Sequence, residues 1–217
     1  MQVEMACGVG KSFLAIEIAR RFPKTLIVVP TLALMEQYVL RYRSLLGCKF
    51  LCFCSINHME GAVKIKVKTN SKTLGKTVVE EERIVVMTTY ASLGQFAYRA
   101  RHMGFKMDVV ILDEAHNVAT EGRYGFLLDE PLVFEKAVLM TATRKLEGEY
   151  NMLDKDIYGE CVYEYNFQRA IEEGIIRDYN LWLAVYRIPG ETEFDCDAEP
   201  EEMFEVVCRA IRERGAG

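Results

Sequence analysis

A glycine-rich segment near the start of the chain restricts the fold more than any other feature of the sequence. Residues 6–12 read Ala-Cys-Gly-Val-Gly-Lys-Ser and lie between a predicted strand at 2–5 and a predicted helix at 13–22. A strand, a tight glycine loop and a helix in this order present backbone N–H groups and a helix N-terminus to an anion. The segment therefore predicts a phosphate-binding loop in an α/β protein.

The order of strand and helix repeats along the chain. Further strands are predicted at 25–29, 49–54, 84–87, 108–112, 136–140 and 179–188, and further helices at 32–46, 92–102, 165–176 and 203–214. Alternation of this kind produces a mostly parallel sheet with helices on both faces, and ligands bind at the carboxyl ends of its strands. The loops expected at that edge are 5–12, 30–31, 88–90, 113–116 and 141–143.

Composition limits the class of protein. The 217 residues, half of them hydrophobic, suffice for one large domain with its own core, or for one domain and the start of another. The net charge of −5 excludes a uniformly basic coat for nucleic acid, and no apolar run reaches the roughly 18 residues of a membrane span. Seven cysteines without a secretory signal are typical of reduced thiols, so we expect a soluble intracellular protein with no membrane partner.

Each residue of the glycine-rich loop has a predicted role at a phosphate group. Four residues would offer backbone N–H groups: Cys7, Gly8, Val9 and Gly10. Lys11 would reach the β- and γ-phosphates of ATP, and the Ser12 hydroxyl would ligate Mg²⁺. The strict pattern of such loops, G-x-x-x-x-G-K-[ST], has Met5 at its first glycine in this chain. A helix start with incidental glycines is the alternative.

Two adjacent carboxylates come directly after the apolar run at 109–112. An acid at a strand end holds Mg²⁺ in P-loop NTPases, which is the role predicted for Asp113. Glu114 beside it would orient and deprotonate the attacking water. Two adjacent acids also occur in solvated turns, but their position at a strand end, about 100 residues after the phosphate loop, points to ATP hydrolysis.

Five segments, in order, resemble the motifs of the superfamily 2 helicases and translocases, in the branch that carries a DEAH sequence. The matching segments are Met5–Ser12 for motif I, Pro30-Thr31-Leu32-Ala33-Leu34 with Gln37 for motif Ia, Thr88-Thr89-Tyr90 for motif Ib, Asp113–His116 for motif II and Thr141-Ala142-Thr143 for motif III. The resemblance covers roughly residues 2–185.

The resemblance implies a three-layer, RecA-like P-loop NTPase domain, the first motor domain of an ATP-dependent enzyme. It assigns contacts with the nucleic-acid backbone to Pro30, Thr31, Thr88 and Thr89. It assigns coupling between nucleotide and nucleic acid to His116, Thr141 and Thr143. Motif Ia and the segment 166–174 resemble restriction-enzyme-like and repair-type translocases, which favours DNA over RNA as the partner.

Residues 1–189 are expected to form this domain, and residues 190–217 an acidic linker and a helix leading toward a second motor domain. The run 191–205 holds eight acids and no base, which is typical of a solvated linker. The second RecA-like domain, with its arginine finger, is expected to lie outside this chain. Very slow ATP turnover is therefore expected from the chain alone.

Other interpretations stay open. The chain fits a P-loop ATPase that does not act on nucleic acid, or a truncated binding module gated by nucleotide. The segment 57–79 holds five lysines and is either a solvated loop or hairpin, or a nucleic-acid contact. A weak zinc hypothesis rests on Cys48, Cys52, Cys54 and His58, although Cys52 and Cys54 are better explained as buried thiols on one face of a strand.

Overall fold

The structure is a computed structural model that describes residues 1–54, 71–129 and 131–178 of the chain. Within it, Met1–Ile176 form one compact unit. The strands of this unit are β1 (Gln2–Met5), β2 (Lys24–Val29), β3 (Lys49–Phe53), β4 (Ile84–Thr89), β5 (Met107–Asp113), β6 (Phe134–Thr141) and β7 (Cys161–Tyr165). The helices are α1 (Lys11–Ala19), α2 (Leu32–Leu46), α3 (Ser71–Glu80), α4 (Tyr90–Met103), α5 (Lys155–Tyr158) and α6 (Phe167–Glu172), with short 3₁₀ helices η1 (Ala115–Asn117) and η2 (Tyr124–Leu127).

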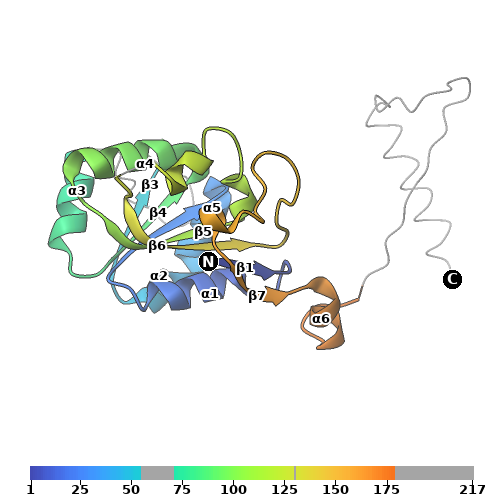
Figure 1. Cartoon of the computed structure of the whole chain (residues 1–217). Helices are drawn as coiled ribbons and strands as arrows, with labels where there is room; N and C mark the ends of the chain where they lie inside the picture. The colour runs from blue at the N-terminus through green and yellow to red at the C-terminus, as the bar shows by residue number, and fades with distance from the viewer. Residues whose placement is uncertain (55–70, 130, 179–217) are drawn as a thin grey trace, which may run out of the picture. The chain divides into compact units, whose positions relative to one another are not determined.

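These strands form one sheet in the order β3-β4-β2-β5-β6-β1-β7, and every neighbouring pair is parallel (Figure 1). The predicted α/β fold with a mostly parallel sheet is therefore confirmed. One strand, β6, lies between β1, which leads into the glycine loop, and β5, which ends at Asp113. Since the carboxyl ends of parallel strands meet at the same edge, the order brings both motifs to one place.

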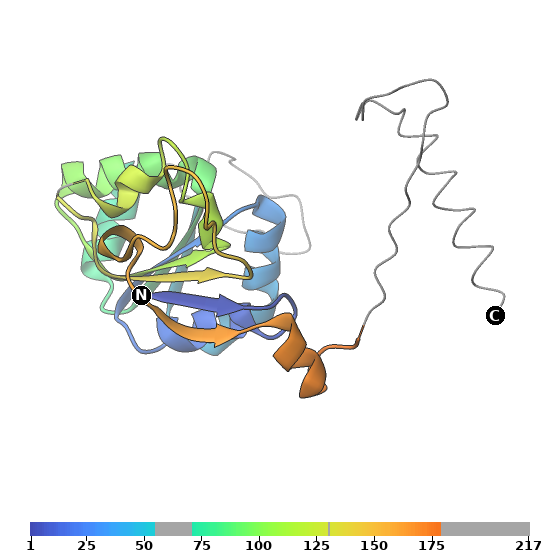
Figure 2. The same cartoon turned by 45° about the vertical axis from the view of Figure 1, so that its right-hand side comes forward.

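Helices cover the sheet on both faces, as the alternation predicted. Val110 and Leu112 of β5 belong to the apolar cluster that includes residues of α3 and α4. Val109 and Ile111 belong to a second cluster, formed with residues of α1 and α2. Figures 1 and 2 show these two pairs of helices on opposite sides of the sheet. Burial on both faces explains why β5 is a continuous apolar run and not an alternating one.

One segment predicted as a loop or hairpin contains a helix. α3 occupies the last part of the Lys-rich segment 57–79. Leu74 and Val78, one helical turn apart, are fully buried in the same cluster as α4. An apolar face at helical spacing was therefore hidden by the high lysine content of the segment. Residues 55–70 lie outside the described residues, so the hypothesis of a nucleic-acid contact there stays a prediction.

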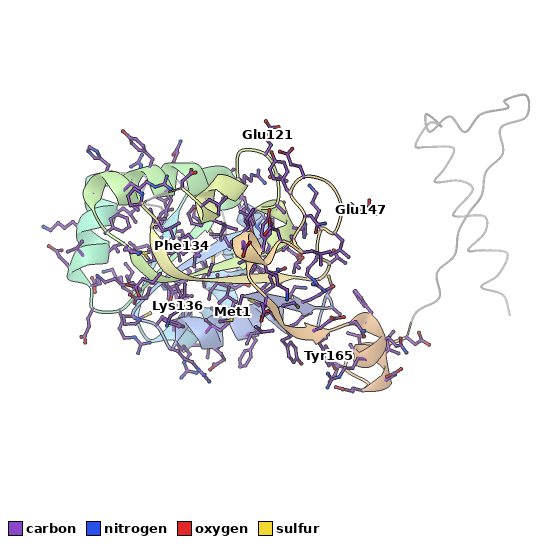
Figure 3. The ribbon with its side chains drawn as sticks, in the orientation of Figure 1. Met1, Glu121, Phe134, Lys136, Glu147 and Tyr165 are labelled. Atoms are coloured by element: carbon purple, nitrogen blue, oxygen red, sulfur yellow. The ribbon has the colours of Figure 1, made fainter. Side chains whose placement is uncertain are left out.

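A second difference concerns the helix predicted over 165–176. Tyr165 is the last residue of β7, and the helix is limited to α6. β7 is an edge strand with three of its five residues exposed, so it lacks the apolar run that marks the inner strands. Ala170 is buried as predicted, but Phe167 is exposed. Figure 3 shows Tyr165 where β7 leads into α6.

Two predicted elements, the strand at 179–188 and the helix at 203–214, lie outside the described residues. The predicted boundary at 189–190 lies there too and stays a prediction. In the part of the chain that the structure describes, no helix has both the length and the apolar composition needed to cross a membrane.

Candidate nucleotide-binding site

The loop between β1 and α1 takes its shape from two glycines. Gly8 and Gly10 have φ angles of +83° and +100°, in a region that residues with a Cβ rarely adopt. Gly10 is the N-cap of α1, and a glycine offers no side chain to cap the first N–H groups of this helix. N–H groups at a helix start are donors that can bind an anion. Around them Cys7, Gly8 and Gly10 are exposed, and Val9 is half-buried.

Met5 stands at the first glycine of the strict pattern without disturbing the loop. It is the last residue of β1, and its side chain is buried in the cluster formed with α1 and α2. Its φ angle is not positive, so the position does not require glycine. Its carbonyl oxygen accepts a hydrogen bond from Lys11 Nζ at 3.1 Å, which helps to hold the loop.

The Lys11 side chain connects the loop to the end of β5. Its ammonium group is nearly buried and donates to the carbonyl oxygens of Met5 and Ala6, at 3.1 and 3.3 Å. The same nitrogen lies 3.8 Å from Glu114 Oε1. The two motifs predicted to share a nucleotide therefore meet in the folded chain.

Asp113 ends β5 and is only 3% exposed. Its Oδ2 accepts a hydrogen bond from the Tyr38 hydroxyl at 2.7 Å, and its Oδ1 accepts one from the Glu114 N–H at 3.1 Å. Burial raises the pKa of Asp113, and this is the largest influence on it. The hydrogen bond from Tyr38 and the charge of Lys11 act in the opposite direction and favour the carboxylate.

Tyr38 is a site residue that the sequence did not reveal, because its place on the apolar face of the helix at 32–46 marked it only as a core residue. Its hydroxyl donates a hydrogen bond to the Asp113 carboxylate. Burial, and next the charge of Asp113, raise the pKa of Tyr38 well above its usual range, so the phenol keeps its proton. The Tyr38 hydroxyl therefore joins α2 to the end of β5.

Glu114 lies between two basic groups at the turn after β5. Its carboxylate oxygens are 3.8 Å from Lys11 Nζ and 3.6 Å from His116 Nδ1. Among the described residues it is the one non-glycine residue with a positive φ, +53°. A left-handed conformation at such a residue costs on the order of 1–3 kcal/mol, and strain of this kind concentrates at active sites. The strained conformation of Glu114 favours its predicted role as a general base.

His116 connects the end of β5 to the end of β6. The Thr141 hydroxyl donates to the Thr143 carbonyl oxygen at 2.7 Å, and its oxygen lies 3.2 Å from His116 Nδ1. Nε2 of the same ring lies 3.2 Å from the Asn117 amide nitrogen. Because the hydroxyl has a single proton, these contacts assign the proton of a neutral imidazole to Nδ1. His116, Thr141 and Thr143 thus form one hydrogen-bonded chain.

An ion pair that no local pattern indicated ties β1 to the residue after Thr143. Arg144 Nε lies 2.5 Å from Glu4 Oε2, and Arg144 Nη2 lies 3.9 Å from Glu164 Oε2 of β7. Glu4 precedes Met5 in β1 and is in register with Thr141 of β6. The pair links the strand that leads into the glycine loop to the segment that follows β6.

The residues predicted to contact nucleic acid lie at the ends of two other strands. Pro30 and Thr31 join β2 to α2, and the exposed Thr31 caps α2 by accepting a backbone N–H bond at 3.2 Å. Thr88 and Thr89 end β4, and both are buried. The Thr88 hydroxyl donates to the Phe53 carbonyl oxygen at 2.7 Å. Thr31 therefore presents its side chain at the surface, whereas that of Thr88 is bonded inside the protein.

The cysteines considered for zinc lie in and beside β3. Cys52 and Cys54 are buried in the cluster formed with α1 and α2, and burial raises the pKa of Cys52 to about 12. Cys48 is half-buried, and His58 lies outside the described residues. Within the ranges that the structure describes, no group of three or more His, Cys, Asp and Glu side chains is placed to hold a metal ion.

Comparison with protein families and curated proteins gives two matches. Residues 1–146 match the family described as the res subunit of type III restriction enzymes. A probable helicase of African swine fever virus is 25% identical to the chain over 190 residues, which cover 83% of this chain and 21% of the relative. The chain therefore spans about a fifth of the length of the curated relative that it matches.

Solved structures share the fold. The type ISP restriction-modification enzyme LlaBIII bound to DNA superposes with a TM-score of 0.67, at 22% identity, over 82% of this chain and 14% of its own. A nuclease-deletion mutant of the type ISP enzyme LlaGI, in complex with a DNA substrate mimic, superposes with a TM-score of 0.62 at 22% identity. The match covers 80% of this chain and 18% of the LlaGI chain. The Hef helicase domain of Pyrococcus furiosus superposes with a TM-score of 0.54 at 20% identity, and the match covers 76% of this chain and 34% of the Hef chain. With more than half of its length matched by the family model, the chain belongs to the family of the res subunit of type III restriction enzymes, and its fold is the RecA-like α/β fold expected from the sequence.

Proposed function

We propose that this chain is the ATP-binding and ATP-hydrolysing motor domain of a DNA helicase or translocase. The observation that carries the proposal is the meeting of Lys11 with Glu114, next to the buried Asp113, at one edge of the sheet. The family and the helicase relative support the nucleotide chemistry. The DNA-bound type ISP enzymes with the same fold support DNA as the partner rather than RNA.

The side chains at this edge fit a magnesium–ATP complex by charge and by donor type. The N–H groups of residues 7–10 and of the start of α1 would receive phosphate oxygens, and Lys11 would neutralise their charge. Oxygens of Ser12 and Asp113 would hold Mg²⁺, which when bound reduces the negative charge of the β- and γ-phosphates. A phosphate group competes with Glu114 for the Lys11 ammonium, so ligand binding would free Glu114 to accept a proton from water.

Nucleic-acid contacts are proposed at 30–31 and 88–89, where α2 and α4 begin. The exposed Thr31 hydroxyl and backbone N–H groups at the two helix starts would contact phosphates without reading bases, so little base specificity is expected. The buried Thr88 hydroxyl would not take part, because it bonds to the Phe53 carbonyl oxygen. The chain of His116, Thr141 and Thr143 would couple this contact to the nucleotide. A second RecA-like domain is proposed as the partner that supplies an arginine finger, and turnover without that partner would be slow. An intracellular location is also proposed, because seven cysteines in a chain of this kind are typical of reduced thiols.

The proposal is tested by binding of a fluorescent ATP analogue in Mg²⁺, with phosphate release followed in the same samples. Lys11→Ala is expected to weaken binding about 10- to 100-fold, because it removes a charged donor to phosphate. Arg20→Ala, which removes an exposed cation of the same region paired with Glu17, is the matched control and should bind like the wild type. A wild-type chain that binds no nucleotide in Mg²⁺ would contradict the proposal.

Two further outcomes would select the alternatives. ATP turnover that neither DNA nor RNA changes, measured together with a second motor domain, would favour a P-loop ATPase that does not act on nucleic acid. Nucleotide binding without turnover in the same mixture would favour a binding module gated by nucleotide.

A further inference from the structure

Two tyrosine hydroxyls hold Asp113 from opposite faces of the sheet. The Tyr38 hydroxyl donates to Asp113 Oδ2 at 2.7 Å, and the Tyr90 hydroxyl donates to the Asp113 carbonyl oxygen at 2.9 Å. Tyr38 belongs to the cluster formed with α1 and α2, and Tyr90 to the cluster formed with α3 and α4. The side chain and the main chain of one residue are therefore bonded to two different helices.

Packing keeps both rings in place. Tyr38 is 1% exposed and Tyr90 is 4% exposed. The Tyr38 ring contacts that of Tyr42 edge to face, with 5.6 Å between the ring centroids. The Arg123 guanidinium lies over the Tyr90 ring, 5.8 Å from its centroid. Because interiors are close-packed, neither hydroxyl leaves Asp113 unless its helix or its ring moves.

The two helices begin at the segments proposed to contact nucleic acid. α2 starts directly after Thr31, and Tyr38 lies about two turns further on. Tyr90 is the first residue of α4, directly after Thr89. A shift at either helix start would therefore move a hydroxyl that is bonded to Asp113.

The Tyr90 hydrogen bond also acts on the turn after β5. The carbonyl group that it bonds belongs to the peptide leading from Asp113 into Glu114. Glu114 has the positive φ of +53°, and an anchored peptide on its N-terminal side helps to maintain that conformation. The Tyr38 hydroxyl thus holds the Asp113 carboxylate in place. The Tyr90 hydroxyl holds the peptide group that leads into Glu114.

We propose that Tyr38 and Tyr90 are positioning residues that connect the nucleic-acid contacts at 30–31 and 88–89 to the catalytic pair. Tyr38 orients the Asp113 carboxylate for Mg²⁺, and Tyr90 holds the turn of Glu114. The inference rests on the proposed function, because the roles of Asp113 and Glu114 belong to it. Phenylalanine at either position keeps the ring and removes only the hydroxyl.

The Mg²⁺ dependence of fluorescent-ATP binding by the full chain tests Tyr38. Tyr38→Phe is expected to raise the Mg²⁺ concentration at half-saturation about tenfold, the usual size of the effect when a partner of a metal ligand is removed. Binding in EDTA should not change. Tyr42→Phe, one turn away on α2, is the matched control and should keep the wild-type value. A purely structural role would lower the folded fraction without moving the half-saturation. An unchanged or lower Mg²⁺ requirement in Tyr38→Phe overturns the role.

Single-turnover phosphate release, with and without duplex DNA, tests Tyr90. Tyr90→Phe is expected to slow release several-fold, at an unchanged Mg²⁺ half-saturation, and to remove the effect of DNA on release while DNA affinity is kept. A variant with the wild-type rate and the wild-type response to DNA overturns the coupling role of Tyr90.

A double-mutant cycle in the absence of nucleotide separates the failure of this inference from failure of the proposed function. The unfolding free energies of the wild type, Tyr38→Phe, Asp113→Asn and the double variant are expected to be non-additive, because the two side chains share a hydrogen bond. Additive values overturn the inference. Non-additive values in a chain that binds no nucleotide refute the proposed function and support the link between Tyr38 and Asp113.

Discussion

The carboxyl ends of β5 and β4 lie at the same edge of the sheet, each strand beside β2, but they use their polar side chains differently. At the end of β5, Asp113 and Glu114 face Lys11, and Glu114 is held in a strained conformation. At the end of β4, the Thr88 hydroxyl bonds to a neighbouring strand, and Thr89 bonds to Ser92 at 3.4 Å. The end of β5 brings opposite charges together at some cost in backbone energy, whereas the side chains at the end of β4 stabilise the fold.

The largest expected effect is at the end of β5. Glu114→Gln should lower single-turnover phosphate release about 10²- to 10⁴-fold, because the proposed general base is removed. Binding of fluorescent ATP should be kept, since glutamine has nearly the same size. Glu121→Gln changes an exposed glutamate on the loop after β5 that Figure 3 labels, and it should release phosphate like the wild type. Wild-type release by Glu114→Gln would remove Glu114 from the catalytic role.

A smaller effect, on stability, is expected at the end of β4. Thr88→Val keeps the shape of the side chain but leaves the Phe53 carbonyl without this donor, which should cost about 1–3 kcal/mol of unfolding free energy. Chemical denaturation measures this cost, and DNA affinity should not change. Thr89→Val is the control. It removes the longer hydrogen bond from Thr89 to Ser92, so it should lower the unfolding free energy by less. Weaker DNA binding at wild-type stability would show that Thr88 serves nucleic acid instead of the fold.

The smallest effect is expected at the start of α2. Thr31→Ala removes the N-cap acceptor and should cost about 1 kcal/mol in chemical denaturation. As Thr31 is exposed, its loss should also weaken DNA binding a few-fold, measured by fluorescence anisotropy. Thr31→Ser keeps the hydroxyl and should restore both properties. A stability loss with wild-type DNA affinity would take Thr31 out of the proposed interface.

The parts of the site that could be predicted are those with a local pattern. Gly8 and Gly10 indicated a tight loop, in which both glycines have positive φ, and the apolar run before Asp113 indicated a buried strand ending in an acid. α3 was missed because its apolar face is short and surrounded by lysines. β7 was missed because an edge strand can remain exposed along most of its length.

The sequence by itself determined the alternation of strands and helices, the shape of the glycine loop and the charges at the strand ends. These properties depend on residues a few positions apart, so they can be recognised without the fold. Only the tertiary structure decided the strand order. In that order only β6 separates β1 from β5, and Lys11 therefore comes close to Glu114. The tertiary structure also decided that Tyr38 bonds to Asp113, 75 residues away, because such contacts arise from packing two helical layers on one sheet and not from any local pattern.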